Sequence, residues 1–265
     1  MFDLTGKAAL VTGASGGIGS DIARALHKQG ATVALSGTRK DALDGLAAEL
    51  GARTHVLPCN LSDAAAVDAL PKQAEEAMGS LDILVNNAGI TRHARDHADL
   101  DALSRQDFLD IYAVNVAGPF LMMQACKTLL AKCYEDTGRA AAVLNVSSIA
   151  GVTGVGSSVA YAASKGAFNT MTLSLARALA PAIRVNAICP GFIGTRWFKD
   201  QMGEEQYKKM EAGVAASVPL HVASGPDDIA DSAVFFCTDA SRHVTGETLL
   251  VDAGMHLGYA PLVAR

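Results

Sequence analysis

The sequence predicts a single α/β domain built on a parallel β-sheet with helices on both faces. Short apolar runs rich in Val, Ile, Leu and Ala alternate with amphipathic helical stretches along all 265 residues. Nearly continuous apolar strands are typical of a parallel sheet buried on both faces, and their alternation with helices indicates a doubly wound fold. No linker-like stretch or change of composition divides the chain, so we expect one domain over residues 1–265.

Each expected strand is an apolar run that ends at a loop containing Gly, Asn, Asp, Ser or Pro. These runs lie at residues 8–11, 32–35, 54–57, 83–85, 142–146, 184–188 and 248–251. Apolar residues at helical spacing predict helices at residues 18–28, 41–50, 106–130, 160–179 and 227–237. A further helix follows the N-cap signal at Ser62 and Asp63 and ends near residue 78.

Residues 194–220 form a long irregular segment before the last helix. The segment is bounded by Pro190-Gly191 and Pro219, and its middle, residues 204–210, is charged and helical in pattern. Long segments of this kind are often active-site covers, so we expect a mobile lid here.

Composition and charge exclude several classes of protein. Half of the residues are hydrophobic and the net charge is 22 − 27 = −5, with no basic block longer than two residues. Such a chain can bury a full core, which excludes a disordered protein, and its acidic balance argues against nucleic-acid binding. The N-terminus lacks a signal-peptide pattern and no apolar run reaches the ~18 residues of a membrane span, so we expect a cytoplasmic protein.

The cysteines predict neither a disulfide framework nor a zinc site. Their number is odd, they are widely scattered, and no two have the C-x-x-C spacing: Cys59, Cys126, Cys133, Cys189 and Cys237. Reduced cysteines packed in the core of a cytoplasmic protein are the expected reading.

A glycine-rich turn directly follows the first strand. Residues 12–19 read Thr-Gly-Ala-Ser-Gly-Gly-Ile-Gly and lead into a predicted helix. In this context the glycines let backbone N–H groups approach a pyrophosphate at the helix N-terminus. A tight turn alone would also need glycine, but its position in the first β–α unit favours a dinucleotide site.

Further motifs follow in order along the chain: Asn86-Asn87-Ala88-Gly89, Ser148, Tyr161-x-x-x-Lys165 and Pro190-Gly191. Together with the glycine-rich turn, they resemble those of the short-chain dehydrogenase/reductase family over essentially the whole chain. Residues 1–90 in particular are similar to the 3-oxoacyl-(acyl-carrier-protein) reductases. The resemblance implies a seven-stranded Rossmann sheet, a nicotinamide cofactor and a homotetramer.

The same resemblance implies which residues contact the cofactor. These are Gly13, Ser15, Gly17, Ile18, Gly19, Thr38, Arg39, Asn60, Leu61, Asn87, Ala88, Gly89, Tyr161, Lys165, Pro190, Gly191, Ile193 and Thr195. The aspartate that would bind the ribose of NAD falls at Gly37 and is missing, while Arg39 can bind the 2′-phosphate of NADP. We therefore expect NADP(H) to be preferred over NAD(H).

Four residues match the catalytic positions of the family: Asn115, Ser148, Tyr161 and Lys165. Tyr161 and Lys165 share one face of a predicted helix. Tyr161 is expected to be the general acid in reduction, with Ser148 holding the carbonyl oxygen and Asn115 binding a water that links Lys165 to solvent. A tyrosine pKa near 7 requires about 4 kcal/mol of stabilisation of the phenolate, which the lysine ammonium and an oxidised nicotinamide could supply.

Other groups of polar residues predict neither a metal site nor a hydrolase nucleophile. His93 and His97 lie in a polar loop without a third ligand at fixed spacing, so no metal site is expected. Ser148 lacks the G-x-S-x-G context of a hydrolase nucleophile. Trp197 and Phe198, in a chain poor in aromatic residues, are interpreted as walls of the substrate pocket.

The expected function is therefore hydride transfer between NADP(H) and a ketone or secondary alcohol, with ketones or 3-oxoacyl esters and thioesters as substrates. A 3-oxoacyl-(acyl-carrier-protein) reductase of fatty-acid synthesis and an NAD-linked secondary-alcohol dehydrogenase are the alternative enzymes. A non-catalytic nucleotide-binding regulator is the alternative of a different class, because a fold alone does not fix a function.

Overall fold

The computed structural model describes residues 2–94, 96–195, 199–200 and 202–258. Its centre is one seven-stranded sheet with the order β3-β2-β1-β4-β5-β6-β7, in which all neighbouring strands are parallel. The strands are β1 (Ala8–Thr12), β2 (Thr32–Ser36), β3 (Thr54–Val56), β4 (Ile83–Asn86), β5 (Ala141–Val146), β6 (Ile183–Pro190) and β7 (Thr248–Val251). This confirms the doubly wound α/β fold predicted from the apolar runs.

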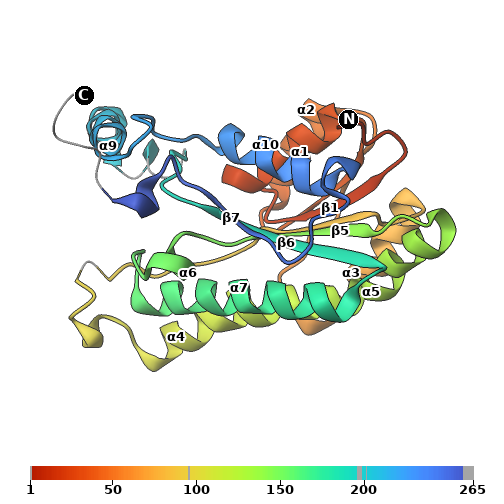
Figure 1. The fold of residues 1–265 in the computed structure, drawn as a ribbon, viewed down its shortest axis with the longest axis horizontal. Helices are drawn as coiled ribbons and strands as arrows, with labels where there is room; N and C mark the ends of the chain where they lie inside the picture. Colours follow the sequence, from red (N-terminus) through yellow and green to blue (C-terminus); the bar gives the residue numbers. More distant parts are fainter. Residues whose placement is uncertain (1, 95, 196–198, 201, 259–265) are drawn as a thin grey trace.

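Helices cover both faces of the sheet (Figure 1). On one face lie α1 (Gly17–Lys28), α2 (Lys40–Leu50) and α10 (Pro226–Cys237), and on the other lie α3 (Ala64–Met78), α4 (Arg105–Tyr112), α5 (Gly118–Thr137) and α7 (Val159–Leu179). The remaining helical elements are η1 (Leu100–Ala102), η2 (Ala113–Ala117), α6 (Ala150–Thr153), α9 (Glu204–Ser217), η3 (Asp239–Ser241) and η4 (Met255–Leu257). No helix in these described ranges is long and apolar enough to cross a membrane.

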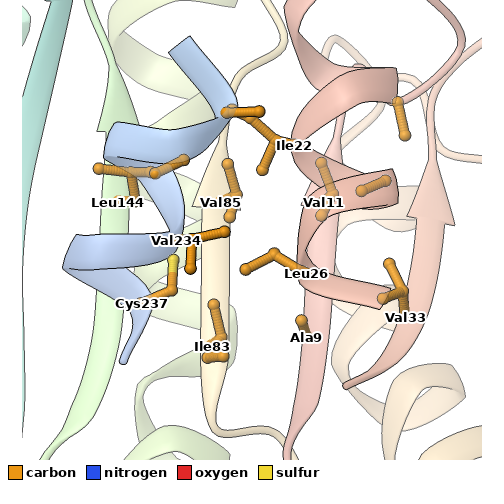
Figure 2. Packing of buried hydrophobic residues seen from close by; sticks show 14 of the residues in the cluster. Ala9, Val11, Ile22, Leu26, Val33, Ile83, Val85, Leu144, Val234 and Cys237 are labelled. Atoms are coloured by element: carbon orange, nitrogen blue, oxygen red, sulfur yellow. The ribbon is translucent and has the colours of Figure 1, made fainter. Parts of the chain in front are cut away.

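The core is formed where two helices pack on the middle strands. Ile22 and Leu26 of α1 lie over strands β1 and β4, and Val234 of α10 packs beside them (Figure 2). These side chains are fully or almost fully buried. At roughly 25 cal/mol per Å² of apolar surface removed from water, each such side chain contributes about 1.5–3 kcal/mol. The sheet is therefore a rigid base for the loops at its edge.

One predicted helix is wrong in its continuity. The sequence predicts a single helix over residues 106–130, but the structure has α4, one turn of π-helix at η2, and then α5, which continues to Thr137. A π-turn holds one extra residue, and such bulges occur frequently at functional sites. The side chain at its centre, Asn115, is buried.

The carboxyl ends of all the strands meet at one edge of the sheet, because the sheet is entirely parallel. The glycine-rich turn follows β1 there, and α6 and α9 follow β5 and β6 (Figure 1). Helix α9 confirms the helical middle of segment 194–220 but extends beyond residue 210 to Ser217. In an open α/β sheet this edge is where ligands bind.

Candidate active site

The glycine-rich turn between β1 and α1 is shaped by close backbone approaches. Gly13 has φ +67°, and a Cβ added to it would lie 2.7 Å from the Asn87 side-chain nitrogen. Helix α1 begins after Gly16, which has no side chain to cap the first N–H groups of the helix. Uncapped N–H groups at a helix N-terminus are a ready site for a phosphate oxygen, so the turn fits the pyrophosphate of a dinucleotide.

Asn87 holds this turn in place from the end of β4. Its side-chain nitrogen donates to the carbonyl oxygens of Thr12 and Gly13 at 3.0 and 3.1 Å. The Thr12 hydroxyl in turn accepts from the backbone N–H groups of Asn87 and Ala88 at 3.0 and 3.2 Å. Asn87, predicted as a cofactor contact, therefore also supports the backbone of the turn.

A groove of about 710 Å³ runs along the strand ends from this turn. Of the predicted cofactor residues, it is lined by Gly13, Ser15, Thr38, Arg39, Asn60, Leu61, Asn87, Ala88 and Gly89. Gly17 and Thr195 line an adjoining hollow on the other side of Ser15 and Gly16. Neither hollow is lined by the remaining residues, which lie in the first turn of α1 or at and just after the end of β6: Ile18, Gly19, Pro190, Gly191 and Ile193.

The end of the groove beyond β2 carries a cation and no acid. The Arg39 guanidinium donates to the Ser15 carbonyl oxygen at 2.7 Å, which holds it against the glycine-rich turn. Gly37 lies beside Ser15, and a Cβ at Gly37 would be 3.3 Å from the Ser15 hydroxyl oxygen. A guanidinium fixed here, with hydroxyl groups around it, suits a phosphate ester.

Ser148, Tyr161 and Lys165 come together at the carboxyl ends of β5 and β6. Ser158 caps α7, and its hydroxyl accepts from the Tyr161 backbone N–H at 3.2 Å, so Tyr161 is fixed in the first turn of the helix. Ser148 lies near enough to the Tyr161 hydroxyl to oppose the effect of burial on the pKa of the tyrosine. A Cβ at Gly151 would lie 2.5 Å from the Lys165 carbonyl carbon, so only glycine lets the loop after β5 pack this closely on α7.

Lys165 is buried, with 4% of its surface exposed. Its ammonium donates to the Val146 carbonyl oxygen at 2.9 Å and lies 5.7 Å from the centre of the Tyr161 ring. Burial lowers the pKa of Lys165 to about 8, although the nearby Cys189 opposes the shift. The charge of this lysine is thus costly to maintain in the folded protein.

Tyr161 has a pKa raised above its ordinary value, because burial penalises the phenolate more than the hydrogen bond from Ser148 stabilises it. This differs from the lowering expected from the neighbouring lysine. The reason is geometric, since the Lys165 ammonium is directed to the Val146 carbonyl. The residues of this site therefore hold Tyr161 as a neutral acid.

Asn115 is fully engaged by its neighbours. Its side-chain oxygen accepts from the Ile90 N–H at 2.8 Å, and its side-chain nitrogen donates to the Ile90 carbonyl at 2.9 Å and to the Ser164 hydroxyl at 3.1 Å. These bonds join the loop after β4 to α7, one residue before Lys165. The predicted water-binding role of Asn115 stays a prediction, whereas its side chain has a positioning role in the structure.

The loop after β6 is fixed by the last strand. Ile149 N–H donates to the Pro190 carbonyl at 3.0 Å, and Gly191 N–H donates to the Val251 carbonyl at 3.1 Å. A Cβ at Gly191 would lie 2.7 Å from that of Asp252, and Ile193 forms a β-bridge with Ser224. This loop therefore forms a defined wall beside the loop that carries Ser148.

Comparisons with known proteins agree with this geometry. A family model described as enoyl-(acyl carrier protein) reductase matches residues 13–256. Nodulation protein G of Rhizobium meliloti (strain 1021) is 37% identical over 256 residues, covering 96% of this chain and 99% of its own. The 3-oxoacyl-(acyl-carrier-protein) reductase FabG of Rickettsia bellii (strain RML369-C) is 36% identical over 257 residues, covering 96% and 99%.

The chain belongs to the short-chain dehydrogenase/reductase family.

Solved structures of the family have the same fold and differ in the cofactor that they contain. A 3-ketoacyl-(acyl-carrier-protein) reductase from Brucella melitensis, complexed with NADH, is 32% identical with a TM-score of 0.84 over 95% of this chain and 99% of its own. The Pseudomonas aeruginosa RhlG/NADP active-site complex is 31% identical with a TM-score of 0.87 over 96% and 98%. This short-chain dehydrogenase/reductase is thus an oxidoreductase, and its relatives bind nicotinamide cofactors.

Sequence reasoning missed a polar ladder beneath the site of this family member. Asn86 of β4 donates to the Asn145 side-chain oxygen at 3.0 Å, and Asn145 donates to the Thr172 hydroxyl at 2.9 Å. Both asparagines are buried. Asn145 lies within the predicted run 142–146, whereas Asn86 follows the predicted run 83–85 and was noted only as part of the Asn86-Asn87-Ala88-Gly89 motif. An asparagine within an apolar strand was the available signal, because a buried amide requires a hydrogen-bond partner.

The histidines of the loop after β4 and the five cysteines form no further site among the described residues. His97 Nε2 lies 3.0 Å from the Gly156 carbonyl oxygen, and the described residues contain no group of three His, Cys, Asp or Glu side chains that could hold a metal ion. All five cysteines are free and buried, as predicted. Trp197 and Phe198 lie outside the described residues.

Proposed function

We propose that this short-chain dehydrogenase/reductase is an NADP(H)-dependent oxidoreductase that transfers a hydride between the nicotinamide and a ketone or secondary alcohol. The observation that carries the proposal is the pair of Tyr161 and Lys165, whose ammonium lies 5.7 Å from the centre of the tyrosine ring, at the sheet edge where the nucleotide groove lies. A non-catalytic nucleotide binder, the alternative from a different class, has no need for such a pair.

The chain's own residues bind, orient and exchange a proton. The cofactor, when bound, supplies or accepts the hydride. Ser148 and Tyr161 hydrogen-bond the substrate carbonyl oxygen, and the Tyr161 hydroxyl gives its proton to that oxygen in reduction and takes it back in oxidation. In this proposal the Lys165 ammonium, one helical turn away, turns from the Val146 carbonyl toward Tyr161 when the phenolate forms and stabilises it there.

NADP(H) is the preferred cofactor in this proposal. Arg39 is held against Ser15 at the position suited to a 2′-phosphate, and no carboxylate occupies Gly37. An NAD-linked dehydrogenase, the alternative enzyme, would place an acid there to bind the free 2′-hydroxyl group.

The proposed substrates are ketones or small 3-oxoacyl esters and thioesters, reduced with little dependence on a carrier protein. A carrier protein is acidic, so binding it requires exposed cations beside the cleft. Residues 180–182 carry no basic side chain, Lys132 lies 3.8 Å from Glu75, and Arg139 is paired with Asp239. The alternative, a carrier-dependent reductase of fatty-acid synthesis, is favoured by the names of relatives such as the Rickettsia bellii protein.

A rate comparison tests this function. Oxidation of NADPH and NADH is measured over a panel of ketones, together with one 3-oxoacyl chain presented on a short thioester and on a carrier protein. We expect turnover with NADPH and similar kcat/KM for both forms of the acyl chain. A gain above about 100-fold with the carrier, about 2.7 kcal/mol of transition-state binding, would support the alternative substrate, and no turnover with any carbonyl would refute the oxidoreductase.

We also propose that the protein is a homotetramer in the cytoplasm. Large apolar side chains are exposed on the helices of one face and on the edge strand, and a tetramer would cover such surfaces. They include Phe108, Leu109, Phe120, Leu173 and Leu249.

A further inference from the structure

A single carboxylate lines the nucleotide groove among the residues that the structure describes. It belongs to Asp110, which lies on α4 one helical turn before Val114, a residue that also faces the groove. A carboxylate repels phosphate groups in the same groove. We therefore expect the Asp110 carboxylate to contact a part of the ligand other than its phosphates, one that carries a hydrogen-bond donor.

The lining residues of the groove follow the strands in order, and Asp110 is among the last of them along the chain. The glycine-rich turn after β1 fits the pyrophosphate, and Arg39 after β2 fits the ribose phosphate. The next strand, β3, is followed by Asn60 and Leu61, and Leu61 packs against the start of α5, where a Cβ at Gly118 would lie 3.2 Å from that of Leu61. The wall formed by Asp110 and Val114 thus adjoins the residues after β3, where the base of the nucleotide would lie.

The side chain of Asp110 is fixed and has acceptor capacity left. The Gln106 side-chain nitrogen donates to its Oδ1 at 2.8 Å, which leaves Oδ2 for a ligand. Asn60 also lines this part of the groove and accepts from the Ser62 N–H at 3.0 Å, but its neutral amide oxygen is a weaker acceptor than a carboxylate. An ionised carboxylate is an acceptor only, so its partner must be a hydrogen-bond donor.

We propose that Asp110 selects the base of the cofactor by accepting a hydrogen bond from the exocyclic amine of adenine. The inference rests on the proposed nucleotide cofactor and adds a residue that determines its base. Because the amine is the group recognised, a purine nucleotide without a donor at this position binds more weakly. The carboxylate thereby offsets its repulsion of the phosphates only for an aminopurine.

The test compares two fragments that differ in one group. Adenosine 2′,5′-bisphosphate and the corresponding bisphosphate of unsubstituted purine are titrated by calorimetry into the full-length protein, without any turnover. We expect wild type to bind the adenine fragment about tenfold more tightly, which corresponds to about 1.4 kcal/mol, and Asp110→Ala to bind both within about twofold. Both fragments carry the same phosphates, so the ratio of their dissociation constants cancels the general effect of removing a charge.

A matched control removes a carboxylate outside the groove. Asp101 lies in η1 and does not line the groove, so Asp101→Ala should keep the tenfold ratio. An unchanged ratio in Asp110→Ala, equal binding of both fragments by wild type, or loss of the ratio in Asn60→Ala alone would overturn the role of Asp110. Failure of wild type to bind either fragment would instead refute the proposed NADP(H) cofactor, and the inference with it.

Discussion

Replacing Lys165 with methionine tests how much the buried ammonium of this residue lowers the free energy of unfolding. In the unfolded chain the lysine pKa is near its ordinary value of 10.5, and in the fold it is about 8. Between these values the unfolded state binds more protons, so the lysine makes stability rise with pH. At about 1.36 kcal/mol per pKa unit, the ammonium costs the folded protein about 3 kcal/mol at pH 7 and only about 1 kcal/mol at pH 10.

Methionine keeps the length of the side chain and does not titrate. The substitution has other effects on stability. They include loss of the hydrogen bond to the Val146 carbonyl, which leaves a buried acceptor at a cost of about 1–3 kcal/mol. These effects do not depend on pH. The stability of Lys165→Met relative to wild type is therefore expected to fall by about 2 kcal/mol from pH 7 to pH 10.

Urea unfolding of both proteins at pH 7, 8, 9 and 10, at one protein concentration, measures this difference. Other groups titrate over the same range, but they are common to both proteins and largely cancel in the comparison. A difference that stays constant with pH would show that Lys165 keeps its ordinary pKa in the fold. A stability of Lys165→Met that rises relative to wild type with pH would show that the ammonium is stabilised in the fold, which contradicts the burial argument.

Two further substitutions and one measurement of mass address the proposed roles and assembly. Tyr161→Phe should lower kcat by more than tenfold and leave the dissociation constant for NADPH within about twofold, because only the proton donor is lost; retained activity above a tenth would refute its role. Arg39→Asp should weaken NADPH binding more than NADH binding, measured by fluorescence titration, since it places a like charge at the phosphate; equal effects would show that Arg39 does not contact the ribose phosphate. Light scattering at micromolar concentration should give the mass of a tetramer, whereas a monomer would contradict the proposed assembly.

The fold could be predicted because the strand signal is local. Strands β1, β4, β5 and β6 are buried along their whole length. The partly exposed edge strands β3 and β7 also read as short runs that alternate with helices, so all seven strands were found. The break at η2 could not be found this way. A π-turn changes the helix by a single residue and leaves the apolar pattern on either side intact, and the contacts of Asn115 with Ile90 and Ser164 that accompany it are distant in sequence.

The candidate site could also be predicted only in part. Motif spacing was enough to find Ser148, Tyr161 and Lys165, because their order along the chain is characteristic. The direction of the Tyr161 pKa was not predictable, since it depends on burial and on the Val146 carbonyl that draws the lysine away. Asp110 was also missed, because a helical residue reveals which cavity it faces only when the rotation of its helix is known.

The π-turn at η2 also limits how this chain can change in length. An α-helix turns about 100° per residue, so deleting one residue from the regular part of α5, outside the π-turn that takes up one extra residue at Ala113–Ala117, would rotate the two parts of the helix against each other by that angle. The apolar face of α5, which includes Met122, Met123 and Leu130, would then leave the sheet that it now covers. A one-residue deletion would therefore keep α5 on the sheet only within Ala113–Ala117, and there it would displace Asn115 from Ile90 and Ser164.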